Sequence, residues 1–450
     1  MKRPASASLF VWAGALAALA ILTVWFWNRA RPETGPPDIV FIVVDTLRAD
    51  HLPAYGYEGA STPNIDRLAA TGVLYERVVA PSSWTKTSMA SIWTSRNALR
   101  HGVLDENSVL PDGLTTLAVA LRDAGYRTVG VNSNPWLKEK FGFTAGFEVY
   151  ETLLVPGGLT RFGEVNERAI ELARAPWDRR PLFLYVHYMD VHAPYVPEPG
   201  SGIPESLVIP GHGALANEQL ELLYRKEGLD GPGVQQRVRA LYDATIEDTD
   251  AAVGALLDSL PPPREGAERV VVLTSDHGEG FREHGTAEHG RNVYPEVYAV
   301  PLILSGSDRL AAGSRLRGQV RSIDLAPTIL QLAGVGKPGS FDGTPLPFDA
   351  DRDEDDRVAV SSVGLNYNLP DAHFVAVVSG AHLYIRERVH GVVEFYDLAG
   401  DPGALKDLGY EYPEVGRYAE VERSLFLEET GQEELEPETV EALRSLGYLN

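Results

Sequence analysis

Apolar runs of strand length that end in acidic residues or histidines limit what this chain of 450 residues can fold into. Uninterrupted runs of this kind are typical of strands buried on both faces, in sheets covered by helices on each side. Segments with helical periodicity lie between them, so the pattern predicts βα units around a large sheet. The runs cover residues 38–44, 126–131, 182–188, 270–273 and 300–304.

The pattern changes in the last quarter of the chain. Residues 334–356 are rich in Pro, Gly and Asp, and the short strand-like segments that follow have the spacing of hairpins, at 374–378, 382–386 and 392–396. Such spacing indicates an antiparallel meander rather than βα units. We therefore predict a main α/β domain over residues 38–345 and a smaller antiparallel subdomain with a tail over residues 346–450.

Composition restricts the kinds of molecule that the folded part of the chain can bind. A net charge of −23 disfavours nucleic acid and anionic lipid as its partners, because both require basic surface. An anionic substrate would need local positive charge, which a bound metal ion could supply. The chain has no cysteine, which excludes a thiol nucleophile and disulfides.

The amino terminus carries a candidate membrane anchor. Lys2 and Arg3 precede an uncharged run, Ala5–Trp27, that is long enough to cross a bilayer as a helix. No small-residue cleavage site ends this run, which favours an uncleaved anchor over a cleaved signal peptide. The prediction is an anchor over residues 1–30 and a linker over residues 31–37. It implies a single-pass protein of the cell membrane with the remainder outside the cytoplasm.

The stretch Thr274–Gly290 follows the apolar run 270–273 and concentrates chemically active side chains. A strand that ends in Ser-Asp-His-Gly places a carboxylate and an imidazole at the carboxyl edge of a sheet, where open α/β folds bind ligands. Mixed oxygen and nitrogen ligands suit a divalent ion. The stretch contains Asp276, His277, Glu279, His284 and His289.

Similar polar groups follow two other strand-like runs. Asp45 follows the first run, where it could bind metal or cap the next turn, and Asp190 and His192 follow the run 182–188. Thr85 precedes a helical segment, where backbone N–H groups and the helix dipole favour an anion. Its hydroxyl could be a nucleophile for an anionic ester or a plain helix N-cap, and composition does not choose between these two roles.

Taken together, the motifs resemble those of the sulfatase family within the alkaline phosphatase superfamily. The resemblance covers nearly everything after the linker, including VDTLRADHL, TPNIDRLAATGV, HYMDVHAPY, TSDHGEGFREHG, DLAPTIL and EFYDLAGDP. It implies a large mixed β-sheet between helical layers, with metal ligands at strand ends. By this resemblance Asp45, Asp276 and His277 match the metal ligands of the family, and Thr85 stands at its nucleophile position.

Three departures from the family pattern affect the expected chemistry. Most sulfatases carry a C/S-x-P-x-R signature whose first residue is oxidised to formylglycine, whereas this chain has Thr85-Lys86-Thr87-Ser88-Met89. Threonine does not yield that aldehyde. The paired aspartates of the first strand end become Asp45-Thr46, and Asn132-Ser133-Asn134 replaces the usual Lys-Trp-His.

The resemblance implies one or two divalent ions (Ca, Mn, Mg or Zn) that activate Thr85 as a nucleophile. One of His192, His284 and His289 would protonate the leaving oxygen, or His192, His284 and His289 would bind a second metal with Asp190. Lys86, Arg100 and Asn134 are candidates for substrate binding.

We therefore predict a metal-dependent hydrolase of sulfate or phosphate esters, with phosphoesters favoured. The expected substrate is an anionic ester, glycan-linked or lipid-linked. The alternatives are a phosphoethanolamine-type transferase and a catalytically inactive binding protein.

Overall fold

The computed structural model describes residues 35–154, 160–174, 178–198, 232–348, 357–366 and 369–430. The predicted anchor over residues 1–30 lies outside these ranges. Within them, no helix combines the length and the hydropathy needed to cross a membrane. Strand β1 begins at Gly35, so the last three residues of the predicted linker belong to the first strand.

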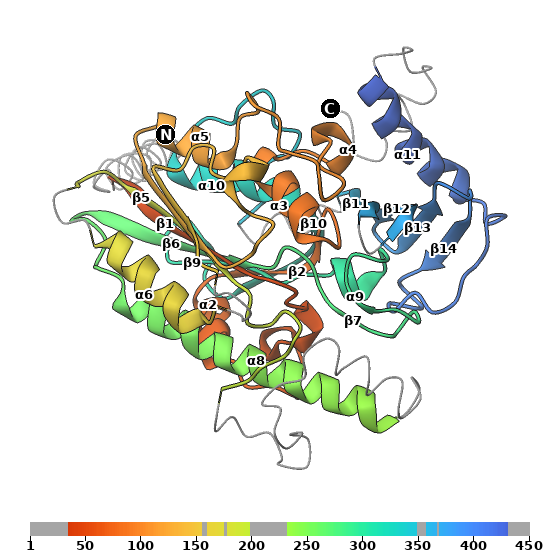
Figure 1. The fold of residues 1–450 in the computed structure, drawn as a ribbon, viewed down its shortest axis with the longest axis horizontal. Coiled ribbons are helices and arrows are strands. Elements are labelled where there is room, and N and C mark those ends of the chain that lie inside the picture. The colour runs from red at the N-terminus through yellow and green to blue at the C-terminus, as the bar shows by residue number, and fades with distance from the viewer. Residues whose placement is uncertain are drawn as a thin grey trace, which may run out of the picture.

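The centre of the fold is a sheet of eight strands (Figure 1). Strand β9 runs antiparallel to both neighbours and the other pairs are parallel, which confirms the predicted mixed sheet. In sheet order the strands are β10 (Ser314–Arg321), β2 (Val73–Val79), β9 (Leu302–Ser305), β6 (Ala267–Thr274), β1 (Gly35–Val44), β5 (Leu182–Tyr188), β3 (Arg127–Asn132) and β4 (Val149–Thr152).

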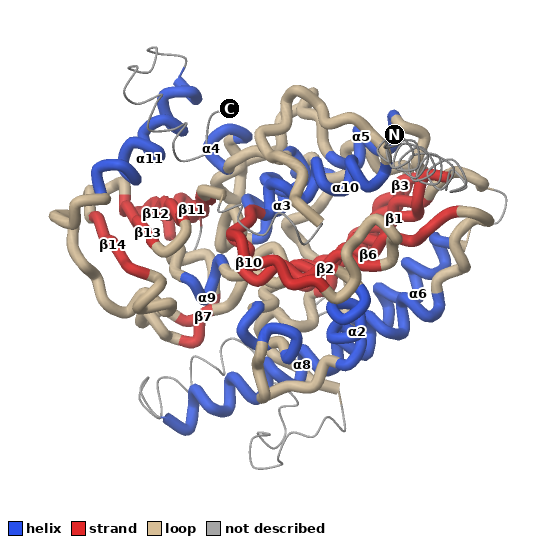
Figure 2. Tube along the Cα trace, turned by 180° about the vertical axis from the view of Figure 1, so that it is seen from behind, coloured by secondary structure: helices blue, strands red, loops and turns tan. Residues whose placement is uncertain are grey.

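Helices cover both faces of this sheet (Figure 2). Alternate side chains of β1 enter two separate cores: Phe41 and Val43 pack on one face, Val40 and Ile42 on the other. The first face is covered by α3 (Thr85–Thr94), α5 (Leu117–Asp123) and α10 (Leu325–Ala333), and the second by α2 (Pro63–Thr71), α6 (Phe162–Ala173) and α8 (Pro232–Ser259). Short helices lie at α4 (Ala98–His101), α9 (Pro295–Tyr298), η1 (Ala49–His51), η2 (Pro53–Tyr55), η3 (Glu139–Phe141) and η5 (Ser322–Asp324).

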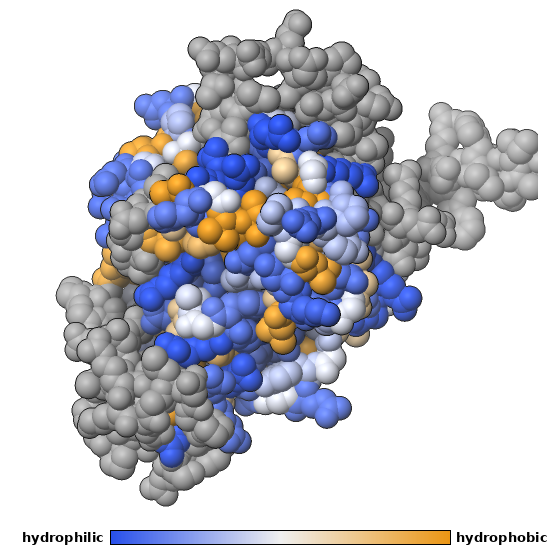
Figure 3. All heavy atoms as spheres, turned by 90° about the vertical axis from the view of Figure 1, so that its right-hand side faces the viewer, coloured by the Kyte–Doolittle hydropathy of each residue, from blue (hydrophilic) through white to orange (hydrophobic). Residues whose placement is uncertain are grey.

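A four-stranded antiparallel sheet forms the C-terminal subdomain, as the hairpin spacing predicts. Its strands are β11 (Ala359–Asn366), β12 (Leu369–Ser379), β13 (His382–Glu387) and β14 (Val393–Asp397), and α11 (Val415–Thr430) packs on it. A two-stranded ribbon, β7 (Gly280–Phe281) and β8 (Ala287–Glu288), lies beside it. Seen from this end, the described surface is mainly hydrophilic with small, separate hydrophobic areas (Figure 3).

His101, at the end of α4, is a buried histidine with a structural role. Its Nδ1 accepts from the backbone N–H of Val103 at 3.1 Å, so the proton of the neutral ring is on Nε2, 2.8 Å from the hydroxyl of Ser91. Burial, reinforced by the charge of Arg96, lowers the pKa of His101 to about 3. The imidazole is therefore neutral in the folded protein over the whole physiological range.

This histidine should make the fold sensitive to acid. Between the unfolded pKa near 6.5 and the folded pKa, the unfolded chain binds one proton more, so stability falls as pH falls. From pH 7.5 to 5.0 we expect this residue to lower the free energy of unfolding by about 2 kcal/mol. Urea unfolding at both pH values, for wild type and His101→Gln, measures this contribution. An unchanged pH dependence in the variant would show that other groups cause the acid sensitivity.

Candidate active site

Four adjacent strands, β6, β1, β5 and β3, bring polar side chains together at their carboxyl ends. Asp45 directly follows β1, Asp276 lies two residues after β6, and Asn134 lies two residues after β3. The parallel register pairs Val43 of β1 with His187 of β5, which sets that imidazole beside Asp45. Pairing in the sheet thus builds the site from segments more than 200 residues apart.

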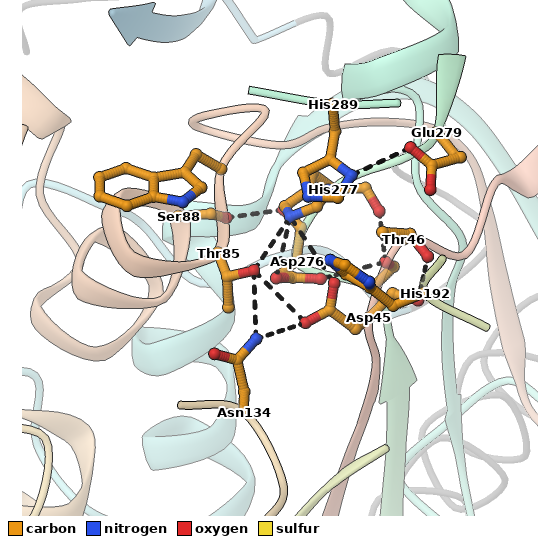
Figure 4. Close-up of polar contacts among 12 residues, drawn as sticks. Asp45, Thr46, Thr85, Ser88, Asn134, His192, Asp276, His277, Glu279 and His289 are labelled. Carbon is orange, nitrogen blue, oxygen red and sulfur yellow. Dashed lines mark hydrogen bonds and ion pairs between the residues drawn. The ribbon is translucent and has the colours of Figure 1, made fainter. Parts of the chain in front are cut away.

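Asp45 is fully buried, and its two carboxylate oxygens differ in their partners (Figure 4). Oδ2 accepts from Asn134 Nδ2 at 2.8 Å, lies 3.0 Å from His187 Nε2, and lies 3.3 Å from the Thr85 hydroxyl. Oδ1 has no hydrogen-bond partner, and neither has Oδ2 of the equally buried Asp276. Buried carboxylate oxygens are normally satisfied, so this pair of bare oxygens indicates a place for a cation.

His277 faces both of these bare oxygens. Its Nε2 lies 3.7 Å from Asp45 Oδ1 and 3.4 Å from Asp276 Oδ2. The Nδ1 atom donates to the carbonyl of Gly278 at 3.0 Å, which leaves a lone pair on Nε2. Two carboxylate oxygens therefore lie within 3.7 Å of one imidazole nitrogen, a donor set that fits a divalent ion.

The electrostatics of the two carboxylates agree with this arrangement. Burial and the negative charge of Asp45 raise the pKa of Asp276. Burial opposes ionisation of Asp45 too, but the hydrogen bond from His187 and the nearby imidazoles outweigh it and lower its pKa. The protein alone thus leaves two buried carboxylates in conflict, and a divalent cation between them would remove that conflict.

Thr85 is the first residue of α3 and points into this group (Figure 4). Its Oγ1 lies 3.1 Å from His277 Nε2, 3.3 Å from Asp45 Oδ2 and 3.4 Å from Asn134 Nδ2. The N-cap residue is Trp84, and its side chain makes no capping bond, so the plain N-cap interpretation of Thr85 is wrong. Ser88, one turn later, donates to the Asp276 carbonyl at 2.6 Å and fixes the helix against β6.

Two further histidines line one side of the site. The ring of His289 lies 4.5 Å from that of His277 and 4.7 Å from that of His192, between centroids. Glu279, fully buried, holds His289 through Nδ1 at 3.0 Å and accepts from the Tyr195 hydroxyl at 2.9 Å. Burial opposes its ionisation, but His289 and Tyr195 hold the pKa of Glu279 below its usual range. Glu279 therefore fixes the orientation of His289 as a carboxylate.

His284 and Arg100 have partners away from Thr85, although the sequence places His284 only seven residues from His277. The His284 Nδ1 bonds the Glu296 carboxylate at 2.9 Å and its Nε2 bonds the carbonyl of Ala404 at 2.9 Å. With both nitrogens engaged, His284 joins the main domain to the C-terminal subdomain. Arg100 forms a 2.8 Å ion pair with Asp342 at the surface.

Lys86 and Asp190 are buried, but each faces another partner. The Nζ of Lys86 donates to the carbonyls of Asp105 and Glu106 at 3.2 and 2.8 Å and lies over the ring of Phe141. Burial lowers the pKa of Lys86 to about 8. Asp190 Oδ1 lies 3.0 Å from the guanidinium of Arg161, and burial raises the Asp190 pKa to about 6. The structure therefore places neither side chain among the groups around Thr85.

One site residue, His187, is missed by the sequence analysis because it lies inside a run assigned to a buried strand. Asp45, His187 and Asp276 form a buried group whose ligand atoms lie within 4.8 Å of one another. The Nε2 of His187 faces Oδ2 of Asp45, an oxygen that already has other donors. The Tyr185 hydroxyl bonds the Nδ1 of His187 at 2.7 Å. An unprotonated Nε2 would face a carboxylate lone pair at 3.0 Å, so this ring donates to Asp45 and holds it in place.

Comparison with known proteins agrees with this geometry. The profile of the family described as Sulfatase matches residues 37–335, well over half of the chain. The chain belongs to the sulfatase family. It is thus an ester hydrolase of the alkaline phosphatase superfamily, as its motifs predict.

Individual relatives are distant but cover most of the chain. An N-acetylglucosamine-6-O-sulfatase from Bacteroides thetaiotaomicron is 25% identical over 74% of this chain and 73% of its own. A structure solved with its substrate D-glucosamine-2-N,6-O-disulfate has a TM-score of 0.70 at 19% identity, covering 91% and 98% of the two chains. The phosphonate monoester hydrolase of Agrobacterium radiobacter has a TM-score of 0.68 at 20% identity, covering 87% and 96%. At these identities the two structures show the fold alone.

Proposed function

We propose that this sulfatase-family member is a metal-dependent hydrolase in which the unmodified hydroxyl of Thr85 attacks an anionic ester, with phosphoesters preferred over sulfate esters. The observation that carries this proposal is the position of Thr85 Oγ1, within 3.3 Å of both Asp45 and His277 at the start of α3. Asp45, Asp276 and His277 would hold the ion. When bound, a divalent ion lowers the pKa of a nearby hydroxyl and neutralises negative charge on the ester.

The other side chains of the site then have defined tasks. Asn134 holds the Asp45 carboxylate and presents the same N–H group to Thr85 Oγ1, where it can stabilise the attacking oxygen. The first-turn N–H groups of α3 face the anionic ester beside the nucleophile. His289, oriented by Glu279 through Nδ1, uses its Nε2 to give a proton to the leaving oxygen.

In the first step, the attack of Thr85 on the ester, one bond forms and one breaks. A bond forms between Thr85 Oγ1 and the phosphorus or sulfur atom, and the bond from that atom to the leaving oxygen breaks. The Thr85 hydroxyl gives its proton to Oδ2 of Asp45, 3.3 Å away, and the leaving oxygen gains one from His289. In the second step water attacks the phosphorus or sulfur atom and gives a proton back to His289, while the bond to Thr85 Oγ1 breaks and Oγ1 recovers its proton from Asp45.

The preference for phosphoesters rests on the identity of the nucleophile. Formylglycine forms a hydrate that expels sulfate by breaking its own carbon–oxygen bond, a route that a threonine ester does not have. A threonine ester must instead be cleaved by attack at phosphorus or sulfur. The sugar sulfates named for two similar proteins make sugar esters the class to test after the reaction type has been established with simple aryl esters.

A substrate panel tests the proposed chemistry. The full-length protein is assayed with matched 4-nitrophenyl monophosphate, phosphodiester, phosphonate monoester and sulfate, each with Mn²⁺, Ca²⁺, Mg²⁺ or Zn²⁺ and without metal. We expect kcat/KM for a phosphorus ester to exceed that for the sulfate by at least about 10-fold, a difference in transition-state free energy of about 1.4 kcal/mol. Turnover of sulfate alone would show that the argument from threonine is wrong.

A further inference from the structure

The four strands that build the candidate active site also enclose a polar hollow at their opposite, amino ends. The hollow has a volume of about 600 Å³ and includes Asp38 of β1, Arg127 of β3 and Leu182 of β5, together with the segment that leads into β6. It is separated from Thr85 by the length of the sheet. The roles proposed above for the site residues leave this hollow unexplained.

Arginine dominates the lining of the hollow. Six arginines contribute to it, against the three carboxylates of Asp38, Asp178 and Glu265, in a chain whose net charge is −23. Such a local excess of positive charge runs against the charge of the whole protein and favours an anionic partner. The arginines are Arg127, Arg174, Arg179, Arg180, Arg264 and Arg269.

Three of these arginines are paired with acids and three are not. Arg180 bonds Glu148 and Asp178, Arg127 lies 3.8 Å from Asp178, and Arg264 lies 3.5 Å from Asp38. Those ion pairs neutralise part of the lining and fix the walls of the hollow. The excess charge of the hollow therefore belongs to the remaining three guanidinium groups.

Neutral groups hold two of the remaining arginines. Arg174 donates to the carbonyl of Ser259 at the end of α8, a helix end that carries only about half an elementary charge, and Arg269 donates to the carbonyl of Pro261. Burial lowers the pKa of Arg269 and outweighs the opposing charge of Asp38. Arg179 is exposed and makes no ion pair or hydrogen bond within the described ranges.

The position of the chain's amino terminus suggests which anion would meet the hollow. The described chain begins at Gly35, and Arg264 of the hollow donates to the carbonyl of Pro36. The preceding residues contain the uncharged run Ala5–Trp27, and the seven residues 28–34 reach at most roughly 25 Å. A bilayer that received this run would therefore lie close to the hollow.

We propose that this hollow, the amino-edge arginine hollow, docks on the anionic phospholipid headgroups of the membrane that receives the amino-terminal segment. The headgroup phosphates pair with the arginines that lack a carboxylate partner. The sheet then stands with its amino edge toward the lipid and its carboxyl edge, with Thr85, toward solution. Clusters of this size attract anionic lipid surfaces, and the attraction decays within a Debye length of about 8 Å at physiological salt.

The absence of native cysteine allows a direct test on the full-length protein in vesicles. A fluorophore on Glu265→Cys, at the exposed rim of the hollow, reports quenching by headgroup-labelled lipid, and one on Tyr410→Cys, 68% exposed in the C-terminal subdomain, is the distant control. We expect vesicles with roughly one third phosphatidylglycerol to quench the rim label at least 3-fold more than neutral vesicles. High salt should abolish the difference.

Charge variants identify the groups responsible. Arg174→Gln with Arg179→Gln should remove most of the dependence on anionic lipid. Arg417→Gln with Arg423→Gln, which removes the same charge from exposed positions on α11 of the C-terminal subdomain, should not. Equal quenching in both lipids, or equal behaviour of the two double variants, overturns the proposal. Titration with inorganic phosphate and glycerol phosphate distinguishes a lipid phosphate from a soluble one. Loss of the quenching of the rim label when either compound is added at micromolar concentration would assign the hollow to a soluble phosphate and overturn membrane docking.

Discussion

Replacing Thr85 by alanine should lower kcat for the preferred ester by at least about 10³-fold, because loss of the nucleophile removes the covalent route altogether. The folded structure should survive, since the side chain is small and its contacts are to groups of the site itself. Thr85→Ser keeps the hydroxyl and should retain activity within about 100-fold of wild type. Steady-state kinetics on the three proteins measures both effects.

A neighbour on the same helix supplies the matched control. Thr87 is equally buried, but its hydroxyl donates to the carbonyl of Val103 at 2.9 Å, away from the site. Thr87→Ala should therefore cost about 1 kcal/mol of stability and little activity. Rapid quenching followed by mass spectrometry should find the phosphoryl group on Thr85 in the wild type. Activity of Thr85→Ala within 10-fold of wild type would sink the proposed mechanism.

Removal of divalent ions should abolish turnover and also lower thermal stability. An ion present at 100 times its Kd stabilises the folded state by about 2.7 kcal/mol, which calorimetry after chelation and re-addition can detect. Asp276 is a buried carboxylate with a raised pKa, so it carries a proton in a growing fraction of molecules as pH falls. An ion that binds must displace this proton, so the affinity for the ion should weaken as pH falls.

The variant Asp276→Asn distinguishes the stability that the ion provides from the stability of the fold itself. Without ion, this variant should be at least as stable as wild type, because it removes the charge conflict with Asp45 in a site where both residues are fully buried. With ion, it should gain no stability and show at least about 10³-fold lower kcat. If Asp276→Asn still gains the full stability from added ion, the ion binds elsewhere.

The architecture was predictable where burial dictates an apolar strand. β1, β5 and β6 are covered on both faces, so each contains an uninterrupted apolar run that leads toward the polar residues of the site. The edge strand β10 and its neighbour β2 carry arginines and glutamate, which breaks the pattern that identifies a strand. Both strands contain exposed positions and so lack the continuous burial on which that prediction depends.

The burial and pairing of the strands also explain which site residues could be predicted from the sequence. Asp45, Asp276 and His277 lie within three residues of the ends of their strands, and parallel strands bring their carboxyl ends to one edge. The role of His187 depends on register and on ring orientation, which the sequence does not contain. His284 lies close to His277 in sequence, but it lies in the turn between β7 and β8, which places it beside Glu296 and away from the nucleophile.

Strand β1 has a consequence for where the enzyme can work. Its ten residues form a rigid spacer of roughly 30 Å from Gly35 to the residue before Asp45. In a chain tethered through its first residues, that standoff would hold the reaction centre above the plane of its own bilayer. Esters borne on soluble molecules or on extended chains from outside would reach it, whereas the headgroups of neighbouring lipids would not.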